Sequence, residues 1–323
     1  MFLEALDTLL ADHATSAAIR RLEAGEPGAG LWNAIAQAGF LDLLRSEEQG
    51  GAGLALTELF PLLECLGRYG APLPIAQTIV ARGLVPDLPD GMATIATQCQ
   101  RPAGGGLRCL QVPAGAVAGH VLACDGDRVL LLDCANVHRD PVGDQRSLVA
   151  HLAWATDTAI VVVGDTGGRQ LLAYAAALTS ALLSGAMQRT FEMALAQCNN
   201  RVQFGKSIGK FQAVQQQISL MAEHVLAAAI AAESAFRGGG PAPAPLAAAV
   251  AKSRTSEAAG LVAATAHAVH GAIGMTDEFD LGLITRRLHD WRMAYGAEQV
   301  WNQQIGLQVL DSGQTLADFV QAV

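Results

Sequence analysis

The spacing of hydrophobic residues predicts helices over the first part of the chain. The stretches "LWNAIAQAGFLDLL" and "LTELFPLLECLGRYG" place apolar residues at i, i+3 and i+4, as on one face of an α-helix. Gly70, followed by Pro72 and Pro74, marks the end of the second helix. Between them, the glycines of "SEEQGGAGLAL" predict a tight loop, either one that approaches a neighbour closely or a plain interhelix turn.

The pattern changes between about residues 90 and 165. Short runs rich in β-branched residues replace the helical spacing, and turn signals such as "DGDR" and "PAGG" separate them. The runs that predict strands are "MATIATQ", "HVLACD", "RVLLLD", "SLVAHLAW" and "TAIVVVG". The sequence therefore predicts a small β region in the middle of the chain.

Helical spacing returns near Gly168. The stretch "QLLAYAAALTSALLSGAMQRTFEMALAQCNN" predicts one helix about 45 Å long, at a rise of 1.5 Å per residue. Another helix begins near Lys210, and "LAAAVAKSRTSEAAGLVAATAHAVHG" predicts a third that ends at Gly271. Between these two helices, "RGGGPAPAP" predicts an exposed loop, because its prolines and glycines cannot continue a helix.

Two shorter helices complete the chain. The stretch "TDEFDLGLITRRLHDW" predicts one with Thr276 as N-cap and with Asp277 and Glu278 in its first turn, and "AYGAEQVWNQQIGLQVL" predicts the last. Helices, then strands, then four or more helices indicate a mostly α protein in three parts. The predicted parts are an N-terminal helical domain over 1–88, a middle β domain over 89–166 and a C-terminal helical domain over 167–323.

Composition and charge exclude several function classes. Hydrophobic residues make up 51% of the chain and charged residues 16%, as in a soluble globular protein. The formal net charge of -9 argues against a nucleic-acid partner. The longest apolar runs contain Ser, Thr and Gly, which favours a buried helix over a membrane span, and the N-terminus lacks the features of a signal peptide. We therefore expect a cytoplasmic protein that does not enter a membrane.

The cysteines are scattered, with no C-x-x-C pair that would indicate a metal site or a disulfide framework. We expect them to be buried or incidental thiols in a reducing cytoplasm. They are Cys65, Cys99, Cys109, Cys124, Cys134 and Cys198.

A cationic stretch, "RVQFGKSIGKFQAV", interrupts the C-terminal helices at Arg201, where Gly205 permits a sharp turn. A guanidinium at such a corner suits a phosphate or pyrophosphate because it donates two parallel hydrogen bonds, and the N–H groups of the next helix would add anion affinity. The alternative is a solvated turn, in which Arg201, Lys206 and Lys210 lie near a helix C-terminus that favours cations. The residues alone leave both interpretations open.

Two more segments carry groups capable of chemistry. The segment "HAVHGAIGMTDEFDL" has histidines three residues apart, but Asp277 and Glu278 are explained as first-turn carboxylates, so no metal site is predicted. The segment "HDWRMAYGAEQVW" offers possible acids and bases without a spacing that assigns their roles. These groups are His289, Asp290, Tyr295 and Glu298.

Three motifs, in this order, resemble the acyl-CoA dehydrogenase family. They are "EEQGGAGLALTELFPLLECLGRYGAPLP", the R-x-x-F-G-x-x-I-x-x-F-Q-A signature in "RVQFGKSIGKFQAV", and "HGAIGMTDEFDLGLITRRL". The resemblance implies an N-terminal α domain, a middle β domain and a C-terminal four-helix bundle. It also implies FAD as cofactor and a coenzyme A thioester as substrate. In the family, a carboxylate removes the α-proton while the β-hydrogen leaves as hydride to the flavin.

The resemblance further assigns residues to the FAD site. In such proteins the C-terminal bundles pair subunits, and FAD lies across that pairing. The signature arginine, here Arg201, reaches the pyrophosphate of FAD held mainly by the neighbouring subunit. Phe204 matches an aromatic packed beside that FAD, Gln212 an amide close to it, and Gln299 a residue near its adenine half.

The family's catalytic base is missing from both usual positions. The stretch "AYGAEQ" places Tyr295 where the glutamate of a Y-E-G-T-like loop should be, and a tyrosine with a pKa of about 10 is a poor base at neutral pH. The other position, on the long helix, is Ala175. Glu298 lies on the next turn and would need a changed loop to serve.

Two further family features are altered. Ala268 replaces a glutamine that contacts FAD, and the usual glycine pair is Gly271–Ala272. The β region lacks a T-E-P-x-A-G-S-D loop, for which "RPAGGGLRCL" is no substitute.

These losses favour a subunit of a heteromeric acyl-CoA dehydrogenase. The chain resembles the shortened, base-lacking subunit of the α2β2 enzymes of steroid side-chain degradation, whose longer subunit carries the base and most of the flavin site. In that case Arg201, Phe204 and Gln212 complete the partner's FAD site. The alternatives are a self-sufficient homo-oligomeric dehydrogenase with Glu298 as an unusual base, and a non-enzymatic interaction protein derived from the fold.

Overall fold

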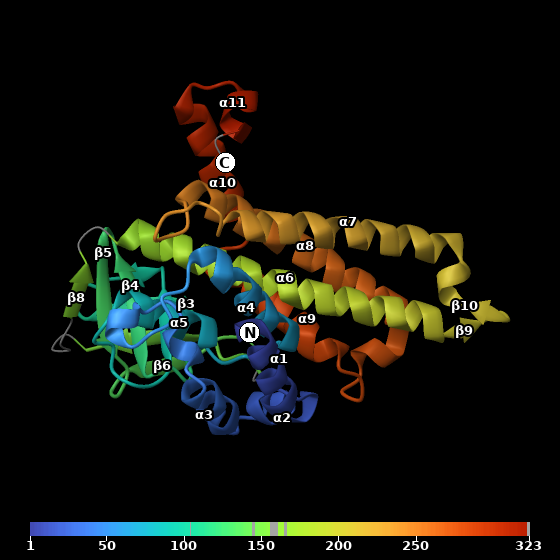
Figure 1. Cartoon of the computed structure of the whole chain (residues 1–323), viewed down its shortest axis with the longest axis horizontal. Helices are drawn as coiled ribbons and strands as arrows, with labels where there is room; N and C mark the ends of the chain where they lie inside the picture. The colour runs from blue at the N-terminus through green and yellow to red at the C-terminus, as the bar shows by residue number, and fades with distance from the viewer. Residues whose placement is uncertain (104, 144–145, 156–160, 165–166, 322–323) are drawn as a thin grey trace.

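A computed structural model describes residues 1–103, 105–143, 146–155, 161–164 and 167–321. Helices come first along the chain, then strands, then longer helices (Figure 1). The predicted fold class, mostly α with a small β region in the middle, is confirmed.

The N-terminal part is helical because each helix buries one apolar face. Leu6 and Leu10 of the first helix pack with Leu59 and Leu63 of the fourth in one hydrophobic core. The carboxylate of Glu58 accepts a hydrogen bond from the Ala55 backbone N–H (2.9 Å), which helps to start the fourth helix. The elements are α1 (Phe2–His13), α2 (Ser16–Glu23), α3 (Ala29–Gln37), η1 (Phe40–Asp42), η2 (Glu47–Gln49), α4 (Leu56–Tyr69) and α5 (Ile75–Leu84).

The described strands of the middle region form two four-stranded sheets. The first has the order β1-β4-β5-β8, with β1 (Ala93–Ala96), β4 (His120–Asp125), β5 (Arg128–Asp133) and β8 (Val161–Gly164). The second has the order β2-β3-β7-β6, with β2 (Cys99–Gln100), β3 (Leu107–Val112), β7 (Ala150–Trp154) and β6 (His138–Pro141). Leu130 and Leu132 of the first sheet share a small core with Leu107 and Leu152 of the second, so the two sheets pack face to face.

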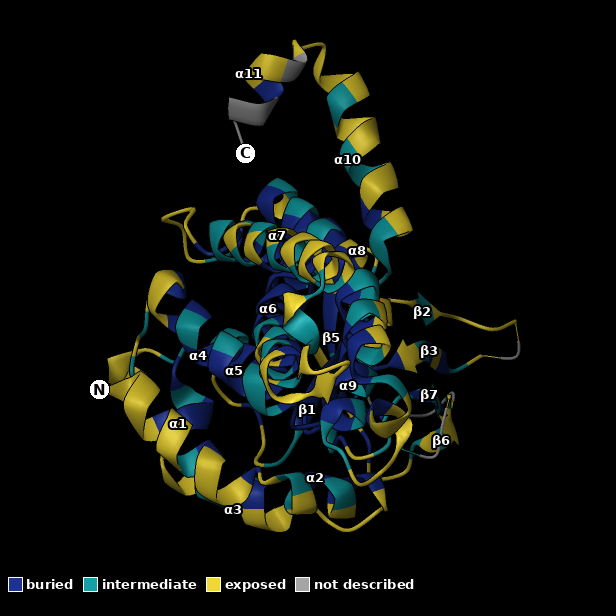
Figure 2. Cartoon of the chain, turned by 90° about the vertical axis from the view of Figure 1, so that its right-hand side faces the viewer, coloured by how far each residue is buried: buried dark blue, intermediate teal, exposed yellow. Residues whose placement is uncertain are grey.

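The C-terminal helices pack around α6, in which residues 171–187 are nearly all buried (Figure 2). Helices α7, α8 and α9 pack with α6, and α10 joins the bundle through α8. The elements are α6 (Gly168–Asn200), β9 (Val202–Gln203), β10 (Lys206–Ser207), η3 (Ile208–Lys210), α7 (Gln212–Ser234), α8 (Pro245–His270), η4 (Gly271–Met275), α9 (Leu281–Met293), α10 (Glu298–Ser312) and α11 (Leu316–Gln321).

Among the described residues, two stretches are long and apolar enough to cross a membrane, namely α6 and Pro245–Met275. In α6, 89% of the most apolar 18-residue stretch is buried inside the protein, as in the core helix of a bundle.

Helices α4 and α6 cross at very short range because glycines remove the side chains at the crossing. A Cβ built on Gly67 of α4 would collide with the backbone carbonyl of Leu182 in α6. A Cβ on Gly185 of α6 would collide with the carbonyl of Glu64 in α4. The two helix backbones therefore touch, and neither position has room for a methyl group.

Replacing Gly67 with alanine is expected to destabilise the protein by about 1–3 kcal/mol, because the added methyl forces two backbones apart. Chemical denaturation of the purified chain measures the effect. Gly30→Ala in α3 is the matched control, since nothing lies within 4 Å of a Cβ there, and it should be neutral or stabilising by up to about 1 kcal/mol. Equal stability of the Gly67→Ala and Gly30→Ala variants would contradict the close crossing.

Helices α10 and α11 project from the body of the protein as an arm (Figures 1 and 2). Trp301 anchors the base of α10, since its side chain is buried and its indole N–H donates to the carbonyl of Gly296 (3.0 Å). Further along the helix, Val300, Leu307 and Leu310 are exposed. The arm therefore presents apolar side chains that the rest of this chain does not cover.

Sequence patterning missed some strands and one helix boundary. Strand β6, "HRDP", lies at a sheet edge without apolar alternation, and β2 and β3 flank a glycine-rich turn. Of the predicted strand "TAIVVVG", residues 158–160 lie outside the described residues, as does the predicted domain boundary at residue 166.

The predicted N-cap role of Thr276 is wrong. Helix α9 begins at Leu281 with Asp280 before it, and Thr276 follows the 3₁₀ turn η4. The Thr276 hydroxyl donates to the carbonyl of Ile273 (2.8 Å), so it is engaged in the preceding turn. Asp277 and Glu278 accordingly lie before the helix and not in its first turn.

Candidate functional site

The signature arginine lies in a hairpin at the end of the bundle farthest from the sheets (Figure 1). Helix α6 ends at Asn200, strands β9 and β10 form a two-residue ladder, and α7 begins at Gln212. We call residues 201–212 the Arg201 corner. Phe204 (φ 50°) and Gly205 (φ 79°) turn the chain with left-handed backbone conformations. For Phe204 this conformation is unusual, and its side chain is 92% exposed.

The Arg201 corner is cationic and open to solvent. Arg201, Lys206 and Lys210 are all exposed. The Lys206 ammonium lies 4.2 Å from the ring centroid of Phe211, which in turn packs edge-on against Phe204 at 6.2 Å. These contacts hold the side chains of the corner in a defined arrangement while leaving the cations available to an anion.

One hydrogen bond ties the corner to the end of α8. The Arg201 guanidinium donates through Nη1 to the carbonyl of His270 (2.8 Å), beside the left-handed Gly271 (φ 66°) that ends α8. A Cβ on Gly271 would lie 3.7 Å from that Nη1 atom, so glycine keeps this approach open. Ala268 and Ala272, where the family has glutamine and glycine, are both exposed on this side of α8.

The two histidines of α8 form hydrogen bonds inside the protein. His267 shares a hydrogen bond between Nε2 and the Thr285 hydroxyl (3.0 Å), and the Nδ1 atom of His270 lies 2.7 Å from the Ala266 carbonyl. Burial lowers the pKa of both imidazoles. The described residues contain no cluster of three or more His, Cys, Asp or Glu side chains that could hold a metal ion.

Tyr295, at the position of the family's base, is buried between α9 and the first sheet. Its backbone is left-handed (φ 60°) and its side chain is 6% exposed. The hydroxyl lies near Gln77 and Thr94, and no atom in the described part of the chain makes a hydrogen bond with it. Burial raises the pKa of the phenol above its usual value, so even less of Tyr295 is ionised and able to accept a proton at neutral pH. The second position, Ala175, is a fully buried methyl group in α6.

Glu298, the fallback candidate for the base, closes the loop between α9 and α10. Its carboxylate forms a two-pronged ion pair with the Arg292 guanidinium, at 2.5 Å and 3.0 Å. The hydrogen bond from Arg292 lowers the pKa of Glu298. A paired carboxylate with a lowered pKa is a poor proton acceptor. Gln299, next along α10, is exposed.

Glu298→Gln is therefore expected to leave catalysis unchanged and to lower stability by about 1 kcal/mol, the value of a partly exposed ion pair. Acyl-CoA oxidation rates and thermal unfolding of preparations that contain the chain measure the two effects. A tenfold or greater loss of rate in a fully folded variant would instead support Glu298 as a base.

A buried lysine caps the end of α9 before this loop. Lys252 of α8 has no exposed surface, and its ammonium donates to the carbonyls of Trp291 (3.1 Å) and Arg292 (2.9 Å) and to the Ser256 hydroxyl (2.7 Å). Burial lowers the pKa of Lys252 to about 7. The charge of this cap therefore changes near neutral pH.

The lowered pKa makes stability depend on pH. Above about pH 7 the folded state has lost the Lys252 proton, whereas the unfolded chain keeps it to about pH 10.5, so stability rises with pH across this window. We expect the native protein to gain stability relative to Lys252→Met by up to about 1.4 kcal/mol per pH unit there. Urea unfolding of both proteins at several pH values measures the difference, and parallel curves would refute it.

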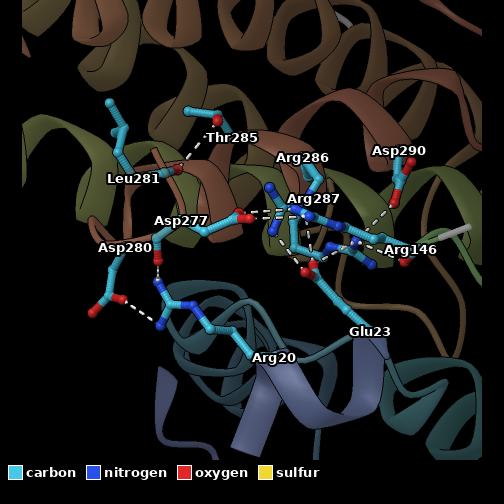
Figure 3. Close-up of polar contacts among 10 residues, drawn as sticks. All are labelled: Arg20, Glu23, Arg146, Asp277, Asp280, Leu281, Thr285, Arg286, Arg287 and Asp290. Atoms are coloured by element: carbon cyan, nitrogen blue, oxygen red, sulfur yellow. Dashed lines mark hydrogen bonds and ion pairs between the residues drawn. The ribbon is translucent and has the colours of Figure 1, made fainter. Parts of the chain in front are cut away.

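A cluster of charged residues joins α2 to α9 (Figure 3). Glu23 of α2 is buried and receives hydrogen bonds from Arg286 (2.6 Å) and Arg287 (3.2 Å) of α9. Arg287 is also paired with Asp290 (3.2 Å). Arg146, from the segment before β7, forms a two-pronged pair with Asp277 (3.0 and 3.2 Å) at the exposed edge of the cluster.

A cavity of about 330 Å³ lies between the second sheet and α9, beside this cluster. Arg287 and Asp290 of α9 and Ala294 just after it line one wall, and Gln111 and Pro113 line the other. Burial raises the pKa of Asp290. Ala294 directly precedes Tyr295, so the cavity lies next in the chain to the position of the family's base, at the C-terminal end of α9.

The structure thus separates the site residues predicted from the sequence. Arg201, Phe204 and Gln212 lie together at the far end of the bundle, whereas Tyr295, Glu298 and Gln299 belong to the loop and arm after α9. Sequence reasoning missed Glu23 and its two arginines. The only available signal was the arginine pair in "ITRRLHD", because the carboxylate that satisfies it lies 263 residues away.

Comparison with known proteins agrees with the fold. A family model described as "Acyl-CoA dehydrogenase, C-terminal domain" matches residues 168–310. The acyl-CoA dehydrogenase IpdE2 of Mycolicibacterium smegmatis is 30% identical over 299 residues, which cover 88% of this chain and 90% of that protein.

Two solved structures extend the comparison. A chain of the ChsE4–ChsE5 complex from Mycobacterium tuberculosis matches with a TM-score of 0.84 at 24% identity, covering 97% of this chain and 96% of that chain. PigA, solved with FAD and proline, matches with a TM-score of 0.81 at 18% identity, covering 96% of this chain and 97% of that chain. At these identities the likeness shows a shared fold.

Proposed function

Because this chain belongs to the acyl-CoA dehydrogenase family, we propose that it is the base-lacking subunit of a heteromeric, FAD-dependent acyl-CoA dehydrogenase. The assembly oxidises an acyl-CoA thioester between its α and β carbons, and a steroid side-chain thioester is the first substrate to test. A longer, related chain supplies the base and most of the flavin site.

The observation that carries this proposal is the separation of the two halves of the site. The Arg201 corner lies at the end of the bundle farthest from the sheets (Figure 1), whereas the chain's own cavity lies between the second sheet and the last residues of α9. The exposed cations of the corner are therefore available to a group that a neighbouring subunit holds.

The residues of the corner fit the pyrophosphate of FAD. The Arg201 guanidinium is a two-pronged donor, Lys206 and Lys210 add positive charge, and α7 begins beside them. The exposed ring of Phe204 packs against the cofactor, and the amide of Gln212 and, on the arm, Gln299 provide polar contacts. When bound, FAD supplies the acceptor for the hydride of the substrate. PigA, a protein of this fold, binds FAD.

The chain's own base positions argue against independent catalysis. Tyr295 is buried with a raised pKa, Ala175 is a methyl group, and Glu298 is held by Arg292. In this assembly the chain binds and orients the cofactor of its partner, and the partner takes the α-proton.

The exposed apolar side chains support assembly with another subunit. They lie on α7 and on the arm, and they are Leu220, Leu226, Ile230, Val300, Leu307 and Leu310. ChsE4–ChsE5, which shares the fold, is a complex of two named chains. We propose an α2β2 assembly in the cytoplasm, with domains over 1–88, 89–166 and 167–323.

Co-expression tests the proposal. The chain is purified alone and together with a longer dehydrogenase-like chain that carries an intact base, and FAD content, mass and thioester oxidation are measured for each. We expect a colourless, inactive chain alone and a yellow, active assembly with the partner. A yellow, active homo-oligomer would refute the proposal in favour of a self-sufficient enzyme. Absence of flavin even with the partner would point to an interaction protein.

A further inference from the structure

Two cysteines that are ten residues apart meet across the edge of the second sheet. Strand β2 pairs with β3 in antiparallel register, and Cys99 lies directly opposite Cys109. Their Sγ atoms are 3.0 Å apart. Neither sulfur is in a disulfide, and the scattered spacing of the cysteines does not predict this contact.

The pair occupies the type of register position that accommodates a disulfide. The backbone N–H of Leu110 donates to the carbonyl of Gln98 (3.0 Å), so the hydrogen bond lies outside the Cys99–Cys109 pair and the two cysteines form a non-hydrogen-bonded pair. At such positions the Cα atoms are about 4.5 Å apart, inside the range of about 4.4–6.8 Å that disulfides span. A covalent bond therefore requires only a small approach of the two sulfurs.

The two thiols differ in access. Cys99 is partly exposed on the edge strand, whereas Cys109 is fully buried. The contact with the Cys99 thiol, together with burial, raises the pKa of Cys109. An oxidant in solution therefore meets Cys99 first, and Cys109 is placed to react with the product.

We propose that Cys99 and Cys109 are a reversible oxidation site that forms an intrachain disulfide in response to a peroxide. The Cys99 sulfur attacks one peroxide oxygen and breaks the O–O bond, giving a Cys99 sulfenic acid and one molecule of water or alcohol. The Cys109 sulfur then attacks the Cys99 sulfur, the S–O bond breaks, and the hydroxyl leaves as water with the proton of the Cys109 thiol. The two sulfurs are oxidised by two electrons in total, and the peroxide is reduced.

The disulfide would fasten an edge strand that is weakly held. Strand β2 has two residues and pairs on one side only. Beyond it, Arg101 is tied to Asp125 by an exposed ion pair (2.7 Å), and β3 continues to Gln111 at the wall of the cavity. Oxidation therefore rigidifies the hairpin between residues 99 and 109 and the strand that leads to the cavity.

The test uses the full chain, reduced, freed of reductant and treated with hydrogen peroxide. Peptide mapping by mass spectrometry should find a Cys99–Cys109 linkage with the loss of two hydrogen atoms, and dithiothreitol should reverse it. Amide hydrogen exchange across residues 99–109 should slow by at least about tenfold in the oxidised chain, since closing a short loop restricts its opening.

Two variants test whether the linkage depends on Cys99 in particular. Cys99→Ser should abolish the linkage and leave Cys109 reduced, whereas Cys198→Ser, which removes a buried thiol in α6, should leave the linkage intact. The proposal fails if Cys99 is oxidised only to sulfinic acid, if it links to Cys124 or Cys134 instead, or if the Cys99–Cys109 linkage forms without slowing exchange in the hairpin.

Discussion

Arg201→Met is expected to lower FAD retention by the two-chain assembly by about 30-fold or more, with a parallel loss of thioester oxidation. Removing one partner of a charge-assisted hydrogen-bonded pair costs roughly 2–5 kcal/mol of binding free energy. Each 1.4 kcal/mol changes the affinity about tenfold, so the lower limit corresponds to the 30-fold loss of FAD affinity. The guanidinium is exposed at the end of the bundle, so its loss should not unfold the chain. FAD released on gel filtration and the apparent Kd for added FAD measure the effect.

Arg237→Met provides the matched control for Arg201. Arg237 is an exposed arginine just after the other end of α7, paired with Glu233, and it should leave FAD binding unchanged. Arg201→Lys should give an intermediate loss, because a lysine keeps the charge without the fork. Full FAD retention in Arg201→Met, in an assembly of unchanged mass, would show that the corner is only a solvated turn.

Glu23→Gln is expected to destabilise the protein by about 3 kcal/mol, because it leaves two arginines of α9 facing a neutral side chain in a buried place. The Glu23 side chain is 4% exposed and that of Arg287 is 3% exposed, so water cannot replace the lost charge. The thermal midpoint should fall by about 6–12 °C, at 2–4 °C per kcal/mol for a chain of this size class. Differential scanning calorimetry of the purified chain measures it.

The exposed edge of the same cluster supplies the control. Asp277→Asn removes a carboxylate that is 71% exposed and paired with Arg146, so the loss should stay below about 1 kcal/mol. If Glu23→Gln and Asp277→Asn lose the same stability, burial does not determine how much each ion pair of the cluster contributes. If neither does, the attachment of α2 to α9 does not depend on Glu23.

Sequence patterning was sufficient where an element depends on its own residues. The long apolar helix α6, the Gly271 terminator of α8 and the proline-rich loop before it were predicted because glycine, proline and helical spacing act locally. Strand β6 was missed because "HRDP" is strand only through its pairing with β7. The N-cap role of Thr276 failed because its hydroxyl is already bonded to Ile273.

The site was predictable only where local sequence motifs mark its residues. Family motifs identify Arg201 and the missing base at Tyr295, but they cannot show that Arg201 contacts the end of α8 while Tyr295 is buried just after α9. The pairing of Arg292 with Glu298 and the burial of Lys252 depend on how α8, α9 and α10 meet. The Cys99–Cys109 contact depends on strand register, and no spacing rule reveals it.

The projecting arm has a consequence for the protease resistance of the chain. Helix α10 has 15 residues and one buried side chain, Trp301, near its first end, and exposed, fraying segments are where proteases cut first. In the proposed assembly, a copy of the chain without a neighbour keeps this helix and its leucines uncovered, whereas an assembled copy hides them. We therefore expect a protease to cut the arm of the unassembled chain faster than the arm of the assembled one.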